Sequence, residues 1–163
     1  MDQKLTLEQK CDKIQSSNHE LRYEIDYMNS IFDKYVLTTV TDINGKILSV
    51  SEPFVKISGF KEEELLERPY SILKHEDMLS EVFEELWKTI SNKKVWRGEI
   101  KNRKKDGGYF WADSTIIPLL NSKKQIIGYR DIKIDITRKK EISDNFSHHL
   151  SEDDNDEEYE IIF

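Results

Sequence analysis

Two turn sequences, each lying between residues that favour strands, constrain the fold of this chain most strongly. Asn44-Gly45 separates 36–42 (VLTTVTD) from 46–50 (KILSV), and Asp106-Gly107-Gly108 separates 95–105 (VWRGEIKNRKK) from 109–119 (YFWADSTIIPL). Asn-Gly and Asp-Gly are typical of tight hairpin turns, whose central residues need positive φ angles. The sequence therefore predicts two hairpins, each formed by two antiparallel strands.

A further strand and three short helices accompany the hairpins. Residues 126–137 (IIGYRDIKIDIT) alternate isoleucine with charged side chains, as strands do, and Pro118 indicates that the strand over 109–119 is ending. Between the hairpins, residues 51–67 predict two short helices interrupted at 58–60 (SGF). The third helix carries apolar side chains at helical spacing: Leu79, Val82, Phe83, Leu86, Trp87 and Ile90. Asp77 precedes this helix in the position of an N-cap.

The order of these elements predicts the fold class. Hairpins require antiparallel neighbours, and amphipathic helices must cover one face of the sheet. We therefore expect an α+β fold, in which short helices cover one face of a five-stranded antiparallel sheet and leave a cavity between the two layers.

The N-terminal segment has an apolar seam with a spacing of three and four residues. Leu7, Ile14, Leu21, Met28 and Tyr35 occupy heptad position d, and Cys11, Asn18, Ile25 and Phe32 occupy position a. A single asparagine at position a fixes register and a two-stranded parallel state. The pattern favours a long coiled-coil helix that forms a homodimer through Leu7, Ile14, Asn18, Leu21, Ile25 and Met28. The alternative is an amphipathic helix that lies on the domain's own sheet, at least over its last heptad.

The charge distribution separates a neutral body from an acidic end. The chain has 163 residues, 32 acidic and 25 basic, and 151–163 (SEDDNDEEYEIIF) holds seven of the acidic ones and no basic one. A neutral body argues against nucleic acid and anionic membrane as partners. No apolar run is long enough to span a membrane, and the single cysteine, Cys11, allows neither an internal disulfide nor a cysteine-based zinc site. We expect a cytoplasmic chain.

We predict four regions along the chain. Residues 1–35 form the coiled-coil helix, residues 36–137 the folded domain, and residues 138–150 an exit helix or linker. Residues 151–163 are expected to be a disordered acidic tail, whose charged residues followed by YEIIF could dock in a basic groove.

The order of elements and several local sequences resemble a PAS sensor domain over residues 36–137. Within that family the chain is most similar to the FAD-binding PAS domain of bacterial aerotaxis receptors. The residues that carry the resemblance lie without a gap: Lys74, His75, Asp77, Met78, Trp87, Trp96, 101–107 (KNRKKDG) and Trp111. The resemblance implies a sensor that binds FAD and reports redox or oxygen state to a partner protein through its flanking helices.

The resemblance also implies cofactor-binding residues. The family's positions fall on Ser51, Lys74, His75, Asp77 and Trp87. This chain departs from the family by having Lys74 in place of arginine, Ser51 in place of asparagine and Glu76 in place of proline. Lysine lacks the planar fork of arginine, and serine lacks the paired donor and acceptor of an amide.

The residue types suit a flavin in different ways. Trp87 offers a stacking face for the ring, and Asn102, on the strand face shared by Trp96 and Ile100, offers an amide for its pyrimidine edge. We expect Lys74, His75 and Asp77 at the mouth of the cavity, facing ribose hydroxyls or pyrophosphate. Each has a simpler interpretation as well: a core tryptophan, a strand-end amide, and an ordinary helix start.

Other functions remain open or are disfavoured. FMN could replace FAD, or the domain could be a dimerisation and interaction module without any ligand. A haem-binding PAS domain would have to use His75, the domain's single histidine. A cysteinyl-adduct light sensor is excluded because Cys11 lies in the leading helix. No nucleophile–base pair, metal cluster or phosphate loop is present, so we expect a sensor or binding module and no enzyme.

Overall fold

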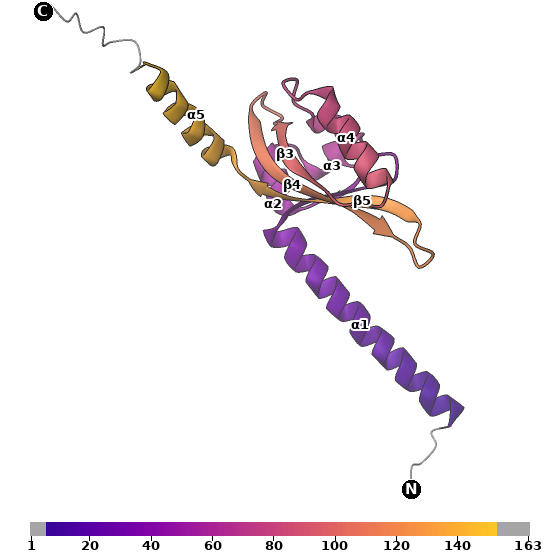
Figure 1. Cartoon of the computed structure of the whole chain (residues 1–163). Helices are drawn as coiled ribbons and strands as arrows, with labels where there is room; N and C mark the ends of the chain where they lie inside the picture. Colours follow the sequence, from indigo (N-terminus) through magenta and orange to yellow (C-terminus); the bar gives the residue numbers. More distant parts are fainter. Residues whose placement is uncertain (1–5, 153–163) are drawn as a thin grey trace, which may run out of the picture.

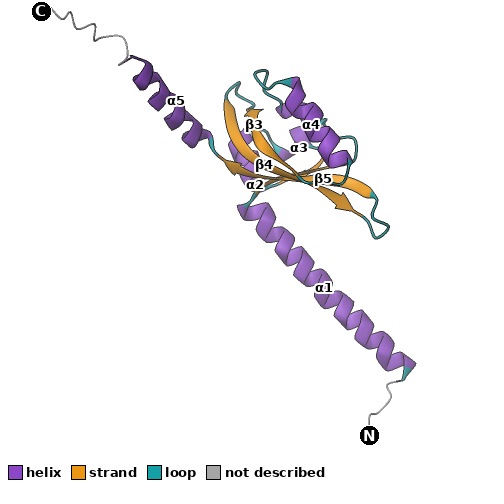
Figure 2. Ribbon diagram, in the orientation of Figure 1, coloured by secondary structure: helices purple, strands orange, loops and turns teal. Residues whose placement is uncertain are grey.

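The computed structural model describes residues 6–152, and the chain folds into one sheet with helices on one face and a long helix at either end (Figures 1 and 2). The strands are β1 (Leu37–Thr41), β2 (Ile47–Val50), β3 (Trp96–Arg103), β4 (Tyr109–Leu120) and β5 (Ile126–Asp135). All pairs are antiparallel, in the order β2-β1-β5-β4-β3. The predicted five-stranded α+β fold is confirmed.

Both predicted hairpins form. In the β1–β2 turn the Asp42 Oδ1 accepts hydrogen bonds from the N–H groups of Asn44 and Lys46, each at 2.8 Å, and Gly45 has a φ of 79°. The β3–β4 turn has Gly107 at a φ of 89°. Left-handed φ angles of this kind favour glycine, which has no Cβ.

The strand predicted over 109–119 forms and ends two residues after Pro118. β4 continues to Leu120, and Pro118 pairs with Tyr129 of β5. On the other side of β4, β3 begins at Trp96, opposite Ile116. Pro118 therefore lies beyond the part of β4 that pairs with β3, so its missing N–H removes no hydrogen bond from that pair.

Four short helical segments connect the two hairpins: α2 (Glu52–Ser58), α3 (Glu62–Leu65), the 3₁₀ helix η1 (Tyr70–Leu73) and α4 (Ser80–Ser91). The break at 58–60 lies between α2 and α3, as predicted. The prediction that Asp77 caps α4 was wrong, because the helix starts later and its N-cap is Leu79, which is exposed and gives no side-chain cap. The carboxylate of Asp77 instead forms an ion pair with Lys101 of β3.

Two apolar clusters lie between the helices and the sheet. One is built around Phe54 and Phe110, whose rings meet edge to face, and the other around Trp96 and Ile90. Cross-strand partners share a face of a sheet, so the pairing of β1, β5 and β4 also places Thr39, Asp131, Lys133 and Ser114 on this inward face. A strip of buried polar residues therefore crosses the middle of the core.

The long N-terminal helix, α1 (Leu7–Tyr35), begins with a capping box formed by Thr6 and Gln9. It has no buried residue, and it leaves the domain as a separate rod (Figure 1). Only its last turns touch the domain: Ile31 and Phe32 are half-buried, and the Arg130 guanidinium lies 6.0 Å from the Phe32 ring. The apolar seam is thus left open over most of α1.

The C-terminal helix, α5 (Thr137–Glu152), is anchored to β4 at its first residue. The Trp111 N–H donates a hydrogen bond to the Thr137 hydroxyl at 2.9 Å, and the Asp135 carboxylate accepts from both the N–H and the hydroxyl of Thr137. The chain enters and leaves the sheet at neighbouring strand ends, because Leu37 pairs with Lys133, and α1 and α5 extend away from the domain on opposite sides (Figure 1). The predicted acidic tail lies outside the described residues from position 153 onward.

None of the helices in residues 6–152 has both the length and the apolar character that crossing a membrane requires.

Candidate cofactor-binding site

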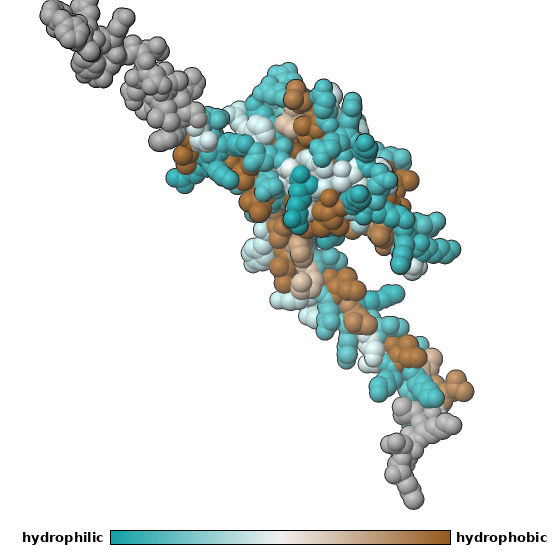
Figure 3. Space-filling model, viewed as in Figure 1, coloured by the Kyte–Doolittle hydropathy of each residue, from teal (hydrophilic) through white to brown (hydrophobic). Residues whose placement is uncertain are grey.

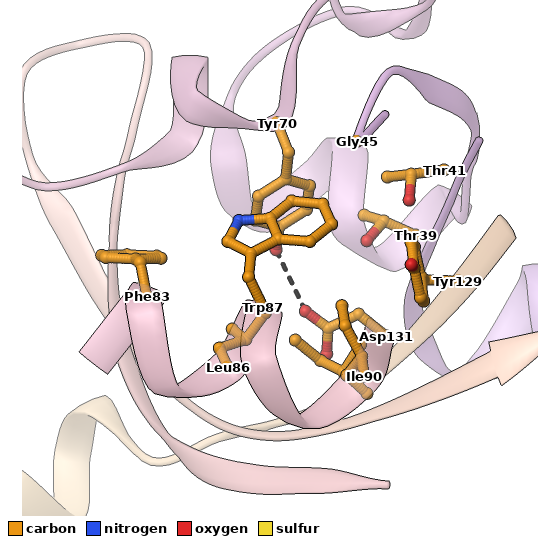
Figure 4. Close-up of a pocket in the computed structure, with 11 residues that line it drawn as sticks. Thr39, Thr41, Gly45, Tyr70, Phe83, Leu86, Trp87, Ile90, Tyr129 and Asp131 are labelled. Atoms are coloured by element: carbon orange, nitrogen blue, oxygen red, sulfur yellow. Dashed lines mark hydrogen bonds between the residues drawn. The ribbon is translucent and has the colours of Figure 1, made fainter. Parts of the chain in front are cut away.

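A small pocket of about 50 Å³ lies where α4 faces the β1–β2 turn and the sheet (Figure 4). Aromatic and aliphatic side chains form most of its wall, with threonine and aspartate at one end. Its lining comprises Thr39, Thr41, Gly45, Tyr70, Phe83, Leu86, Trp87, Ile90, Ile116, Tyr129 and Asp131. A mostly apolar hollow with a few polar groups is the usual form of a site for a planar organic ligand.

Trp87 closes the mouth of the pocket and is its most exposed wall. Trp87 belongs to the apolar stripe predicted for this helix, and its side chain is 38% exposed. Its ring lies edge to face with Tyr129, with centroids 5.6 Å apart, and the far edge of the indole rests against Gly45. A stacking face at the mouth can cover a ligand and still shift to admit it.

The polar end of the pocket is a buried ion pair on β5. The Lys133 ammonium binds Asp131 Oδ2, and the Tyr70 hydroxyl donates a hydrogen bond to the same oxygen at 3.1 Å (Figure 4). The ammonium also lies 5.4 Å from the Tyr70 ring and 5.9 Å from the Phe54 ring. Both charged side chains are almost completely buried.

The burial of this cluster shifts the protonation of its members. Burial raises the pKa of Tyr70 well above its ordinary value, and the adjacent Asp131 carboxylate adds to the effect, so the phenol stays protonated as a donor. Burial lowers the pKa of Lys133, and the ion pair with Asp131 opposes that shift. The carboxylate is therefore held by two donors on one oxygen.

Several buried polar atoms on the inward face of the sheet have no hydrogen-bond partner among the described residues. They are Thr39 Oγ1, Trp96 Nε1, Asn102 Oδ1, Ser114 Oγ and Asp131 Oδ1. An unpaired buried polar atom costs about 1–3 kcal/mol, and most native structures leave few of them. Three of them, Thr39, Ser114 and Asp131, belong to the strip that crosses the core, and Trp96 lies in the same cross-strand row as Asp131. Asn102 lies at the opposite end of β3. The unpaired atoms around Asp131 are therefore the ones placed to meet polar atoms of a ligand.

Asn102 lies on the predicted face, together with Trp96 and Ile100, and is fully buried. Its amide nitrogen donates to the Ile100 carbonyl at 3.1 Å, which leaves the amide oxygen as a free acceptor. Asn102 does not line the pocket. Its backbone forms an isolated antiparallel bridge with that of Lys74.

Lys74 connects the pocket to a second, more polar groove. Its ammonium lies 4.5 Å from the centre of the Phe83 ring, which is part of the pocket wall. The groove itself, of about 450 Å³, is lined by Ser71, Lys74, His75, Glu76, Arg103 and Gly107. The side chains of Lys74 and Arg103 provide positive charge that a phosphate group can pair with, and Glu76 in the same lining opposes it.

Asp77 lies near this groove without lining it. Its N–H donates to His75 Nδ1 at 3.2 Å, and its ion pair with Lys101 lowers the pKa of the carboxyl group. Lys101 also covers the Tyr109 ring at 4.1 Å, and His75 meets the same ring edge to face. The cluster surrounds Tyr109 at the rim of the β3–β4 hairpin, so His75 does not point into the pocket as an axial haem ligand would.

Ser51 is buried and acts within the fold. Its hydroxyl oxygen accepts from the Thr38 N–H at 3.0 Å and from the Phe54 N–H at 3.4 Å, where it caps α2. The side chain lines neither the pocket nor the groove.

Of the six predicted site residues, Trp87 lines the pocket, and Lys74 and His75 line the groove. The residues that the sequence did not single out are Tyr70, Asp131, Lys133 and Arg103. Charged residues in the alternating segment 126–137 were a signal for Asp131 and Lys133, but alternation alone does not tell which face of a strand lies inward.

The donor and acceptor set fits a flavin. The pocket supplies aromatic faces and the inward strip supplies unpaired donors and acceptors, as an isoalloxazine ring requires. The adjoining groove supplies cations for a phosphate.

Comparisons with known proteins agree with this fold. The PAS fold family model matches residues 47–131, which is just over half of the 163-residue chain. The aerotaxis receptor of Escherichia coli (strain K12) is 32% identical over 101 residues, covering 62% of this chain and 20% of the receptor. The nitrogen fixation regulatory protein of Klebsiella oxytoca is 25% identical over 116 residues, covering 71% of this chain and 23% of that protein.

Solved structures show the same arrangement. The PAS domain of a protein from Colwellia psychrerythraea superimposes with a TM-score of 0.63 at 26% identity, covering 70% of this chain and 98% of that one. An RNA-binding light-oxygen-voltage receptor gives a TM-score of 0.67 at 21% identity, covering 77% of this chain and 36% of the receptor, which shows a shared fold. The chain spans about a fifth of the two curated relatives, so the likeness concerns one domain of each.

Proposed function

The chain belongs to the PAS fold family, and on that premise we propose that it is a cytoplasmic sensor that binds FAD and reports redox or oxygen state to a partner protein through its flanking helices. Its similarity to an aerotaxis receptor and to a nitrogen fixation regulatory protein supports a role in signal transduction. In this proposal the domain is a binding module, and any output comes from the protein to which it signals.

The observation that carries the flavin proposal is the strip of unpaired polar atoms beside an aromatic pocket. Trp87, which rests on Tyr129 in this structure, would cover one face of the ring, and Asp131 and Thr39 would meet its polar edge. When bound, the flavin would supply reversible electron transfer. The protein's own residues would bind and orient it and exclude water from it.

The groove beside the pocket supports a cofactor with phosphate groups. Lys74 and Arg103 would neutralise them, and His75 would donate a hydrogen bond. Lys74 lies against the pocket wall at Phe83, so the two sites adjoin. An extended cofactor can therefore reach from one to the other, which favours FAD or FMN over riboflavin.

The experiment is an absorption spectrum of the purified full chain, followed by identification of any released cofactor by mass. The proposal expects a yellow protein with flavin bands that releases FAD. A colourless chain that takes up neither FAD nor FMN when either is supplied would overturn the proposal.

A ligand-free interaction module is the second candidate. The observation that favours it is that the protein's own buried ion pair, Lys133 with Asp131, already fills the polar end of the core. The same spectrum and uptake experiment separates the two candidates.

For either function, we propose that the chain forms a homodimer through α1. The apolar residues predicted to form the dimer are exposed in the single chain, between 52% at Met28 and 89% at Leu7, and Figure 3 shows hydrophobic residues spaced along this helix. The polar residue Asn18 at position a supports a parallel pair in fixed register. A second copy of α1 is the partner whose apolar spacing matches this seam.

A further inference from the structure

The most unusual group in the core is Asp131, a buried carboxylate of which only one oxygen is satisfied. Asp131 Oδ2 receives both Lys133 and Tyr70, whereas Asp131 Oδ1 has no partner among the described residues. The residue is 96% buried, with a relative exposure of 4%, and it lines the pocket.

The two donors on Oδ2 determine what Oδ1 can do. A carboxylate that pairs with an ammonium and accepts from a phenol is an acceptor at both oxygens. The remaining oxygen can therefore bind only a ligand group that carries a hydrogen, such as N–H or O–H. Lys133 and Tyr70 fix the orientation of the carboxylate, so Oδ1 is a rigidly placed acceptor for that hydrogen.

Thr39 stands directly beside this acceptor. Thr39 and Asp131 are cross-strand partners on β1 and β5. The Thr39 hydroxyl lies next to that of Tyr70, whose pKa it acts to lower, but among the described residues it has no partner at hydrogen-bond distance and angle. A hydroxyl can rotate to donate to a carbonyl oxygen. The pair thus offers an acceptor and a donor side by side, which complements a ring edge with N–H next to C=O.

We propose that Asp131 is the specificity-determining acceptor of the pocket and selects planar aromatic ligands that present a cyclic amide N–H, with Thr39 donating to the neighbouring carbonyl. This inference rests on the proposed function, in which the N–H is N3–H of the flavin pyrimidine edge. Lys133 and Tyr70 are positioning residues, because they act through the carboxylate.

The test compares FAD with FAD methylated at N3, which lacks the hydrogen. Fluorescence titration of the full chain should give binding of the methylated cofactor about 10- to 100-fold weaker, because a charge-assisted hydrogen bond is lost. The paired variant Asp131→Leu/Lys133→Met removes the acceptor without leaving a buried charge unpaired. It should bind both cofactors with equal, weakened affinity.

The outcomes separate the two proposals. Equal binding of the two cofactors by the unaltered chain overturns the role of Asp131 and leaves flavin binding intact. Discrimination that persists in the paired variant also overturns it, because the methyl group would then act by size alone. Failure to bind FAD at all overturns both. Asp113→Asn, which changes an exposed carboxylate on the other face of the sheet, is the matched control and should discriminate like the unaltered chain.

Discussion

The indole of Trp87 lies directly against Gly45, so that a Cβ built on this glycine would stand 3.1 Å from two of the ring carbons. One residue belongs to α4 and the other to the β1–β2 turn, and the contact forms the outer rim of the pocket. The Gly45 carbonyl also accepts from the Tyr70 N–H at 2.8 Å. The turn, the helix and the polar end of the pocket are therefore connected.

The contact predicts that Gly45→Ala displaces Trp87 and weakens FAD binding. The substitution strains a φ of 79° and crowds the indole, and the strain alone costs about 1–3 kcal/mol. Gly107→Ala is the matched control, because this turn has a φ of 89° with nothing within 4 Å of the new Cβ. Urea unfolding should show a loss of stability in both variants, and a cofactor titration should show weaker binding only in Gly45→Ala. If Gly45→Ala and Gly107→Ala bind FAD equally well, the contact between Gly45 and Trp87 does not shape the binding site.

Trp87→Ala should lower cofactor binding far more than stability. The side chain is partly exposed, so its removal leaves little empty space in the core. Leu86→Ala, at the adjacent position of α4, removes a side chain that is 95% buried and should cost about 2–5 kcal/mol. Unfolding midpoints and FAD titrations of the two variants measure both effects. If the Trp87→Ala protein binds FAD normally, Trp87 does not contribute to cofactor binding.

The ion pair of Lys133 with Asp131 predicts a strongly non-additive response to mutation. Lys133→Met leaves an unpaired buried carboxylate and should cost about 3–5 kcal/mol, whereas the paired variant Asp131→Leu/Lys133→Met should be near neutral. Lys46→Met, which breaks the exposed pair with Glu67, is the control and should have a small effect. Denaturant unfolding of all three variants provides the measurement. A loss of stability in the paired variant as large as that in Lys133→Met, or larger, would argue against a buried, coupled pair.

The Asp77–Lys101 pair predicts a loss of stability in acid. The pKa of Asp77 is lowered in the folded state, so the unfolded chain binds more protons once the pH falls below about 3.8. The stabilisation is present above that value and disappears as the pH falls through the folded pKa. Asp77→Asn should thus be less stable than the unaltered chain near neutral pH, and the two unfolding midpoints should converge in acid. A constant difference across this range would show that the pair does not contribute through charge.

The seam of α1 predicts a parallel dimer in register. Cys11 is exposed and lies at position a, so mild oxidation should link two chains through this residue, and Cys11→Ser should abolish the link. Leu21→Glu places charge in the seam and should give a monomer, as judged by sedimentation. Tyr23→Glu, on the opposite side of the helix, is the matched control and should remain dimeric. A monomeric unaltered chain would contradict the proposal.

The sequence predicted those features that depend on local chemistry. Asn44-Gly45 and Asp106-Gly107 specified the hairpins, and the break at 58–60 separated two helices as expected. Asn102 was correctly placed on the buried face of β3.

The features that it did not predict depend on packing between distant segments. Asp77 has the sequence position of a helix N-cap because it precedes an apolar stripe, but its carboxylate forms an ion pair with Lys101 of β3 instead. The strand of Asp131 and Lys133 buries both charged residues as an ion pair, and Tyr70, from a helix some sixty positions earlier, donates a hydrogen bond to Asp131. No local pattern contains that information.

The measurement that tests the central claim most directly is an equilibrium titration of the full chain, freed of any bound cofactor, with FAD. The account predicts saturable binding of one FAD per chain, lost in Trp87→Ala and retained in Asp113→Asn. A chain that is folded by circular dichroism and yet binds neither FAD nor FMN would contradict it.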